Sequence, residues 1–219
     1  MHNKYCVIDN ASVVTGSFNP TAAAARDYNN LLVINSTALA AFYSNNFERL
    51  KIRNKEKTPT TAAVAGNKLK PKAAILNTTP VEVHFCPEDG CMEAVKRELQ
   101  KANRSIIFAA YSFTSPELAN ELILKRAEGL AVAGVIEKST AGSKYSKHAA
   151  MAANDIDVKL ESSKRLMHHK FFVIDNETVV TGSFNPTMSA DERNDENVII
   201  IKNKEMAEKY LGEFDKIFG

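Results

Sequence analysis

Several features that mark other protein classes are absent or rare in this chain of 219 residues. Tryptophan is absent, and only 9 glycines and 7 prolines occur, which argues against collagen-like, low-complexity or wholly disordered chains. The longest apolar runs, 106–110 and 198–201, are far shorter than the ~20 residues that span a bilayer. Residues 1–30 carry scattered charges and no basic flank before an apolar stretch, so we expect no signal peptide and, by default, a cytoplasmic protein.

Neither the net charge nor the cysteine content indicates a binding partner or a cofactor. Lys and Arg number 28 against 26 Asp and Glu, a net charge of +2. Three cysteines cannot build a disulfide framework, and although Cys86 and Cys91 could pair, we expect them to be reduced. Their spacing without a second cysteine pair is a weak zinc signal, so we expect no metal and no cofactor.

An internal repeat dominates the sequence. Residues 2–21 and 168–187 are identical at 15 of 20 positions, far beyond chance, and begin 166 positions apart, too far for a solenoid repeat of roughly 20–50 residues. The length allows one domain or one domain plus part of another. The repeat therefore predicts two copies of one module, each carrying a site.

The second copy contains a full alternation of expected strands and helices. Apolar patterning predicts strands at 81–85, 105–112, 130–137, 155–160, 171–175, 178–182 and 198–201, and helices at 92–102, 116–128, 143–153 and 204–218. Such alternation is typical of an α/β sandwich whose mixed, mostly parallel sheet is flanked by helices.

The first copy is cut, because only Met1 precedes its motif. We therefore expect residues 1–53 to be the C-terminal half of a first module, in a fragment or a chain with a misplaced start, and 81–219 to be a complete module. Residues 54–80 read as a basic linker. Between Glu48 and Lys72 eight basic residues face two acidic ones, which suits a solvated linker or a phosphate-attracting arm.

The second repeat carries a pattern suited to phosphodiester chemistry. His168 and Lys170 have equal parity on a strand and so share a face, about 6–7 Å apart. The imidazole can attack phosphorus or donate a proton, and the ammonium can neutralise the charge that grows on the phosphoryl oxygens. Ser183 and Asn185 add neutral donors for substrate binding.

The first repeat restates every polar member of this set. The matching residues are His2, Lys4, Asp9, Gly16, Ser17 and Asn19, with Ser17 and Asn19 the expected substrate contacts. Two such sites imply two histidines that face each other, one as nucleophile and one as general acid, without a metal.

The duplicated H-x-K-x-x-x-x-D and G-S-x-N patterns resemble the phospholipase D superfamily. The resemblance implies a phosphohistidine intermediate, metal independence and an active site at a pseudo-twofold axis between modules. Asp175 and Asp9 complete the motifs and are counted with the catalytic residues, although this Asp is usually structural in the family. A later acidic residue orients the histidine, and Glu196 matches that position; Asn29 stands there in the first copy, which puts the orientation of His2 in doubt.

Other polar residues have weaker patterns. His84 and His148 have no partner spacing and are expected to be satisfied surface or edge residues. Four residues after the strand that ends at 137 are candidates for contacting substrate phosphate, since ligands enter such sheets at the carboxyl edge: Lys138, Ser139, Lys144 and Lys147.

The resemblance, the compact second module and the basic linker favour a nuclease that acts on DNA or RNA. A phospholipase D or phosphatidyltransferase acting on phospholipid is the first alternative, and an inactive fragment or nucleic-acid-binding module is the second. Either His2 folds against His168 within one chain, or two chains form a homodimer that pairs His168 with its copy through 81–219. We expect the homodimer, because the strand 4–9 would leave an unpaired sheet edge.

Overall fold

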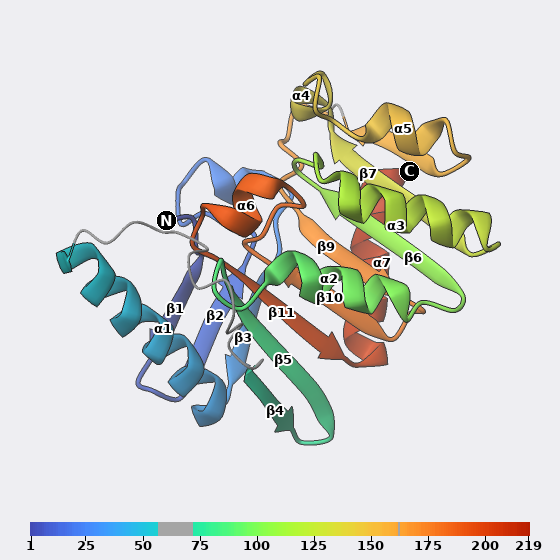
Figure 1. The fold of residues 1–219 in the computed structure, drawn as a ribbon. Coiled ribbons are helices and arrows are strands. Elements are labelled where there is room, and N and C mark those ends of the chain that lie inside the picture. Colours follow the sequence, from blue (N-terminus) through green and yellow to red (C-terminus); the bar gives the residue numbers. More distant parts are fainter. Residues whose placement is uncertain (57–71, 162) are drawn as a thin grey trace.

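The computed structural model describes residues 1–56, 72–161 and 163–219, which form two sheets and their helices (Figure 1). The smaller sheet is antiparallel, in the order β1-β2-β3. The elements of this first unit are β1 (Tyr5–Ile8), β2 (Ser12–Gly16), a short 3-10 helix η1 (Ala24–Arg26), β3 (Leu31–Asn35) and α1 (Thr37–Glu56).

The larger sheet has eight strands in the order β4-β5-β11-β10-β9-β6-β7-β8. Its strands are β4 (Lys72–Leu76), β5 (Thr79–Cys86), β6 (Ser105–Ala110), β7 (Ala131–Glu137), β8 (Asp157–Glu161), β9 (Lys170–Ile174), β10 (Thr178–Gly182) and β11 (Glu196–Lys202). The helices between and after them are α2 (Cys91–Gln100), α3 (Pro116–Ala127), α4 (Lys138–Ala141), α5 (His148–Ala152), α6 (Met188–Glu192) and α7 (Lys204–Phe218).

The α/β class and the mixed sheet are confirmed, but the expected majority of parallel strands is wrong. Only β6 with β7 and β7 with β8 pair in parallel; the other five neighbouring pairs are antiparallel. Parallel neighbours need a long crossover, which only the helical connections through α3 and α5 supply. Tight turns at Asn77 and at Asp175–Asn176, all with positive φ, instead fold adjacent strands back on themselves.

Helix boundaries follow local capping. Ser115 accepts a hydrogen bond from the Leu118 backbone N–H and is followed by Pro116 in the first turn of α3. Asn203 caps α7 in the same way through the Met206 N–H. These caps fix the first turns of α3 and α7, which lie on opposite faces of the large sheet.

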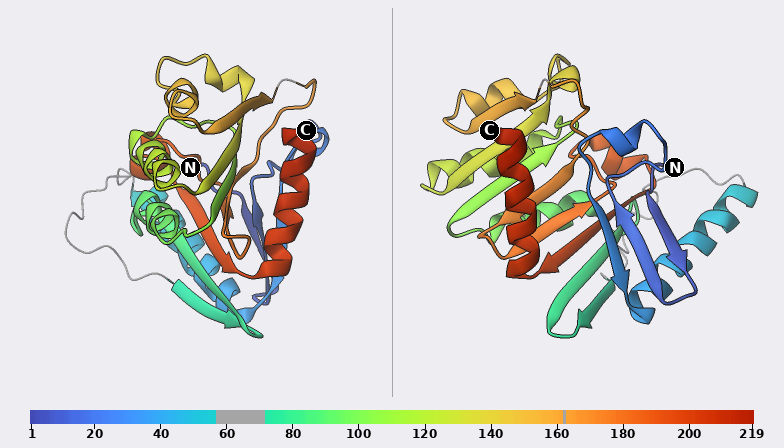
Figure 2. Two further views of the ribbon diagram at one scale, coloured as in Figure 1. Left: turned by 90° about the vertical axis from the view of Figure 1, so that its right-hand side faces the viewer. Right: turned by 180° about the vertical axis from the view of Figure 1, so that it is seen from behind.

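The large sheet is covered on both faces (Figure 2). Helices α2 and α3 pack on one face over a core that includes Phe108 and Phe172. On the other face α7 and the first unit share a second core, in which Leu39 and Tyr43 of α1 join strand residues such as Ile199. The first unit is therefore packed into the fold, because its apolar side chains cover the large sheet.

Two expectations about residues 54–91 need revision. Strand β4 and the start of β5 lie inside the range expected to be a linker, whereas most of that basic segment, 57–71, lies outside the described residues. Cys86 and Cys91, expected to be reduced, form a disulfide, because the turn from β5 into α2 brings their Cα atoms to 5.6 Å. No helix in the described ranges is long and apolar enough to cross a membrane.

Candidate active site

The two repeats meet in one chain through reciprocal backbone contacts. The His2 N–H donates to the Asp195 carbonyl, and the His168 N–H donates to the Tyr28 carbonyl, each at 2.9 Å. Asp195 precedes β11 by one residue, and Tyr28 lies just before β3, so each motif histidine is attached to the third strand region of the other repeat. The histidines of the two repeats therefore border one site, as the within-chain alternative predicted.

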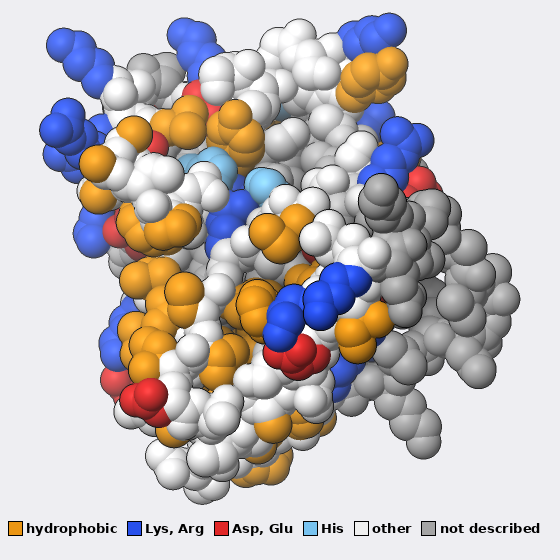
Figure 3. Space-filling model, turned by 90° about the vertical axis from the view of Figure 1, so that its left-hand side faces the viewer, with side chains coloured by type: hydrophobic (Ala, Val, Ile, Leu, Met, Phe, Trp, Pro, Cys, Tyr) orange, Lys and Arg blue, Asp and Glu red, His pale blue; other side chains and the backbone are white. Residues whose placement is uncertain are grey.

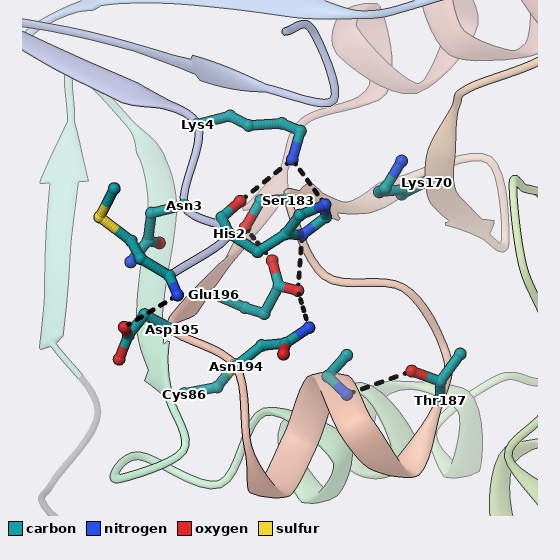
Figure 4. A network of polar contacts seen from close by, with 12 residues as sticks. His2, Asn3, Lys4, Cys86, Lys170, Ser183, Thr187, Asn194, Asp195 and Glu196 are labelled. Carbon is teal, nitrogen blue, oxygen red and sulfur yellow. Dashed lines mark hydrogen bonds and ion pairs between the residues drawn. The ribbon is translucent and has the colours of Figure 1, made fainter. Parts of the chain in front are cut away.

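Each histidine is paired with the lysine of its own motif, as Figure 4 shows for His2 and Lys4. The Lys4 Nζ donates to His2 Nε2 at 2.9 Å and to the His2 carbonyl at 3.0 Å. The Lys170 Nζ makes the same contacts with His168, at 3.1 Å and 3.0 Å. Both imidazoles thus turn Nε2 toward an amine, which leaves Nδ1 to be held by another group.

The orienting carboxylate acts across the repeats. Glu196, expected to orient His168, accepts from His2 Nδ1 at 2.7 Å instead. Its other oxygen accepts from the Ser183 hydroxyl at 2.6 Å, and the Asn194 amide donates to the first oxygen at 3.1 Å. Because Glu196 is fully buried, this carboxylate is held rigidly behind the imidazole, and the doubt about the orientation of His2 is removed.

The Nδ1 atom of His168 is held by neutral groups. Its Nδ1 lies 3.0 Å from both the Ser17 carbonyl oxygen and Asn29 Oδ1. The Asn29 amide nitrogen donates to the Ala24 carbonyl at 2.9 Å, which fixes the amide so that its oxygen faces the imidazole. The substitution of an amide for a carboxylate therefore affects His168 and not the histidine of its own repeat.

Burial and neighbouring cations make the site electrostatically unusual. The pKa of His168 is lowered to about 3, first by burial and then by Lys170 and Lys4. Burial, reinforced by Lys4, also lowers the pKa of Lys170 well below its ordinary value. Burial lowers the pKa of Lys4 as well, although Glu196 opposes this. A site that crowds amines in this way favours a bound anion. Figure 3 shows histidines in a hollow of the surface with Lys or Arg beside them.

The two motif serines do not face the site as expected. Ser17 and Ser183 are fully buried. The Ser183 hydroxyl donates to Glu196, and the Ser17 hydroxyl lies 3.5 Å from Asn29 Oδ1. Their role in the structure is to hold the groups behind the histidines, because a buried hydroxyl beside a carboxylate or amide is already satisfied.

The glycine before each serine allows the repeats to close tightly. Gly16 and Gly182 have φ of +147° and +138°, and a Cβ on either would lie 2.3 Å from the Asn30 or Asn197 carbonyl oxygen. The glycine of each G-S pair is therefore required, because the backbone approaches so closely that a side chain would not fit.

Asn19 and Asn185 remain candidates for substrate contact. Both are half-buried, and each carbonyl accepts from the backbone N–H two residues on, at Thr21 and Thr187. Asn185 Oδ1 is buried without a hydrogen-bond partner. An unpaired polar atom at this position suits a group completed by substrate.

The motif aspartates lie away from the histidines. Asp175, at the turn after β9, accepts from three backbone N–H groups at 2.8–3.0 Å, those of Asn103, Arg104 and Ser105. Partial burial opposes its ionisation, but these donors lower its pKa. Asp9 is exposed in the equivalent turn. Counting the two with the catalytic residues is wrong, because the side chain of Asp175 anchors a turn at the opposite end of the strand.

His84 and His148 are satisfied, as expected, but His84 is not at the surface. His148 is half-buried and lies 3.1 Å from the Val158 carbonyl oxygen. His84 is buried beside Glu82 and the Asp89 carbonyl oxygen. The prediction of a surface position is wrong for His84, because β11 and β4 enclose β5.

The residues after β7 stay as predicted candidates. Lys138, Ser139 and Lys144 are exposed, and Lys147 is half-buried. Tyr111, which the sequence placed only within a strand, has its ring 4.9 Å from that of His168, with Lys170 Nζ 5.2 Å from the ring centre. The sequence signal that could have singled out Tyr111 was its position near the end of the predicted strand 105–112.

Comparison with known proteins agrees with this geometry. The family described as cardiolipin synthase, PLD-like domain, matches residues 1–51 and 95–218. A phospholipase D of Rickettsia conorii is 37% identical over 136 residues, 62% of this chain and 68% of that protein.

Two solved structures share the fold. Nuc, a phospholipase D family member from Salmonella typhimurium, is 31% identical with a TM-score of 0.62, over 64% of this chain and 94% of that one. Phosphatidylserine synthase from Haemophilus influenzae, 14% identical, has a TM-score of 0.71 over 99% of this chain and 60% of its own. With its paired histidine and lysine motifs, the chain belongs to the phospholipase D superfamily and is a phosphodiesterase of the hydrolase class.

Proposed function

We propose that this protein is a nuclease that hydrolyses phosphodiester bonds of DNA or RNA through a phosphohistidine intermediate. The observation that carries the proposal is the meeting of two histidine and lysine pairs, each with Nε2 beside an amine. The amines suit the non-bridging oxygens of a phosphodiester, and the imidazoles suit attack and proton transfer. Similarity to Nuc over 94% of that chain supports a nucleic acid substrate.

The different partners of the two histidines support a division of roles. His168, whose pKa is lowered to about 3, is neutral at physiological pH, and the electron pair on its Nε2 accepts a hydrogen bond from Lys170. A nucleophile needs that state. His2 has a buried carboxylate 2.7 Å from Nδ1, which stabilises a positively charged imidazole. A general acid needs that state, so we assign His168 as nucleophile and His2 as acid and base.

The reaction then proceeds in two balanced steps. As Lys4 and Lys170 turn from the imidazoles to the phosphoryl oxygens of the substrate, His2 holds a proton on Nε2. His168 Nε2 then attacks phosphorus, the bond to the leaving oxygen breaks, and the proton on His2 Nε2 passes to that oxygen. In the second step His2 takes a proton from water as the water oxygen attacks phosphorus, and the phosphorus–nitrogen bond breaks with its electron pair returning to His168. Lys4 and Lys170 stabilise the charge on the phosphoryl oxygens in both steps.

An aryl substrate separates the two roles. The 4-nitrophenolate of bis(4-nitrophenyl) phosphate leaves without a proton, so His2→Ala should still release a burst of nitrophenol and then stall as phosphoenzyme, whereas His168→Ala should give no burst. Proteolytic mapping of the trapped phosphate should find it on His168. A label on His2, or a burst from His168→Ala, would reverse the assignment.

Phospholipid hydrolysis is the second candidate, because the Rickettsia conorii relative is a phospholipase D. Cleavage of a labelled single-stranded oligonucleotide and of phosphatidylcholine or cardiolipin vesicles by the same preparation distinguishes the two. Oligonucleotide cleavage that is lost in His168→Ala supports the nuclease. Vesicle hydrolysis with no oligonucleotide cleavage would overturn it.

Chelation tests the chemistry independently of the substrate. The proposed roles use imidazoles and amines only, so activity should persist in excess EDTA. The measurement is the initial rate of phosphodiester hydrolysis before and after exhaustive dialysis against chelator. Complete loss that added Mg²⁺ or Zn²⁺ restores would contradict the proposed mechanism.

A further inference from the structure

A basic cleft lies beside the site, between η1 and the segment that leads to His168. The cavity has a volume of about 500 Å³ and opens to solvent. Its lining residues are Ala25, Arg26, Asp27, Lys164 and Arg165. None of the catalytic assignments uses this cleft.

The cleft is joined to the histidines by a short parallel pairing of backbone. Tyr28 N–H donates to the Leu166 carbonyl at 2.9 Å, and His168 N–H donates to the Tyr28 carbonyl. The next residue, Asn29, contacts the His168 imidazole. Arg165 stacks over the Tyr28 ring, 5.8 Å from its centre. The cleft is therefore built on the same two segments that hold the nucleophile.

The cleft is near His168 along the chain, because Arg165 precedes that histidine by three residues and the Tyr28 backbone bonds to both Leu166 and His168. A strand of nucleic acid with one phosphate at His168 carries further phosphates on either side of it.

The charge of the cleft is strongly positive. Arg26, Lys164 and Arg165 are exposed, and within the described ranges none of them has a carboxylate within 4.0 Å. The one acidic lining residue, Asp27, accepts a hydrogen bond from the Leu166 N–H at 3.2 Å. Cations without acidic partners next to a phosphodiester site are suited to a second phosphate, and arginine can bind one through two parallel hydrogen bonds.

We propose that this cleft binds a phosphate of the substrate next to the scissile one, so that the preferred substrate is a nucleic acid strand of several linked phosphates. The inference rests on the proposed nuclease function and adds a second contact to it. A substrate with a single phosphodiester cannot make that contact, and it therefore offers an internal comparison.

The test is a pair of matched double variants. Arg26→Gln with Arg165→Gln removes two positive charges from the cleft, and Lys204→Gln with Lys209→Gln removes two from α7, where those lysines pair with Glu177 and Glu205. Steady-state kinetics are measured on a single-stranded oligonucleotide and on bis(4-nitrophenyl) phosphate, at several salt concentrations.

We expect the cleft variant to raise KM for the oligonucleotide about tenfold and to lower the salt slope of log(kcat/KM) by about 0.7, the value for one phosphate contact on a single strand. Its kcat/KM for bis(4-nitrophenyl) phosphate should change less than about twofold, because that substrate has no second phosphate. The α7 variant should behave as wild type on both substrates.

An unchanged oligonucleotide KM, or an equal loss of kcat/KM on both substrates, would overturn the proposal that the cleft binds a neighbouring phosphate. A failure of the nuclease function itself would look different. Wild-type protein would then hydrolyse bis(4-nitrophenyl) phosphate and lipid vesicles but not the oligonucleotide, and the cleft variant would bind a fluorescent oligonucleotide as weakly as wild type does.

Discussion

At the scale of single residues, the two histidines differ in the group that faces their Nδ1 atom. His2 Nδ1 faces a carboxylate oxygen of Glu196, and His168 Nδ1 faces an amide oxygen of Asn29, at 2.7 Å and 3.0 Å. A carboxylate stabilises an imidazolium far better than an amide does. The repeat therefore carries nearly the same residues in two electrostatic environments.

Glu196→Gln should reduce kcat for a nucleic acid substrate by about 10²-fold, within the contribution of a positioned general acid. The nitrophenol burst from bis(4-nitrophenyl) phosphate should persist in the same variant, because that leaving group needs no proton from His2. Glu196→Asp should recover part of the rate. Reduced stability with an equal loss of the nitrophenol burst would mean that Glu196 has only a packing role.

The lowered pKa of His168 predicts a dependence of stability on pH. In the unfolded chain this imidazole takes up a proton below about 6.5, whereas the folded protein keeps it neutral down to a pKa of about 3. The unfolded state then binds more protons, so the contribution of His168 is complete above pH 6.5 and is lost as the pH falls toward 3.

Urea unfolding at several pH values checks this sign. The free energy of unfolding should fall less steeply between pH 6.5 and 4.5 in His168→Gln than in wild type. The imidazole resonance of His168 in the folded protein should not titrate above pH 4. A resonance that titrates near pH 6.5 would contradict the burial argument.

At the scale of elements, the glycine before each motif serine lets the second strand of its repeat approach the third strand closely. Gly182→Ala places a Cβ 2.3 Å from the Asn197 carbonyl oxygen at a φ of +138°. We expect it to destabilise the fold by at least about 2 kcal/mol, from backbone strain and overlap. Gly142→Ala is the matched control, since nothing lies within 4 Å of its Cβ, and should stay within about 0.5 kcal/mol of wild type. Chemical denaturation measures both; equal effects would argue against the overlap.

At the scale of the whole molecule, the site closes within one chain. The backbone contacts of His2 with Asp195 and of His168 with Tyr28 are intramolecular. The homodimer that pairs His168 with its copy stays a prediction, but the second histidine of the site is already present. Mixing inactive His2→Ala with inactive His168→Ala should therefore restore no activity on an oligonucleotide. Recovery on mixing, or an active His2→Ala variant, would favour a site shared between chains.

The repeat by itself determined the family of this protein and predicted its chemistry. Two copies of histidine and lysine on strands, each followed by G-S-x-N, predicted the reacting groups, since side-chain type and strand parity are local properties. The helices 92–102, 116–128 and 204–218 followed from apolar spacing for the same reason, and the structure has α2, α3 and α7 there.

Tertiary structure alone decided which partner each group has and which face is buried. Glu196 belongs to the second repeat by sequence but serves His2, because the third strand region of each repeat crosses to the other. Ile8 and Ile174 occupy the same repeat position, yet they are 48% and 4% exposed. In the described chain β9 has β6 beside it and α2 and α3 above it, whereas β1 is an edge strand. Burial and hydrogen-bond partners depend on segments far away in the sequence, which no local pattern contains.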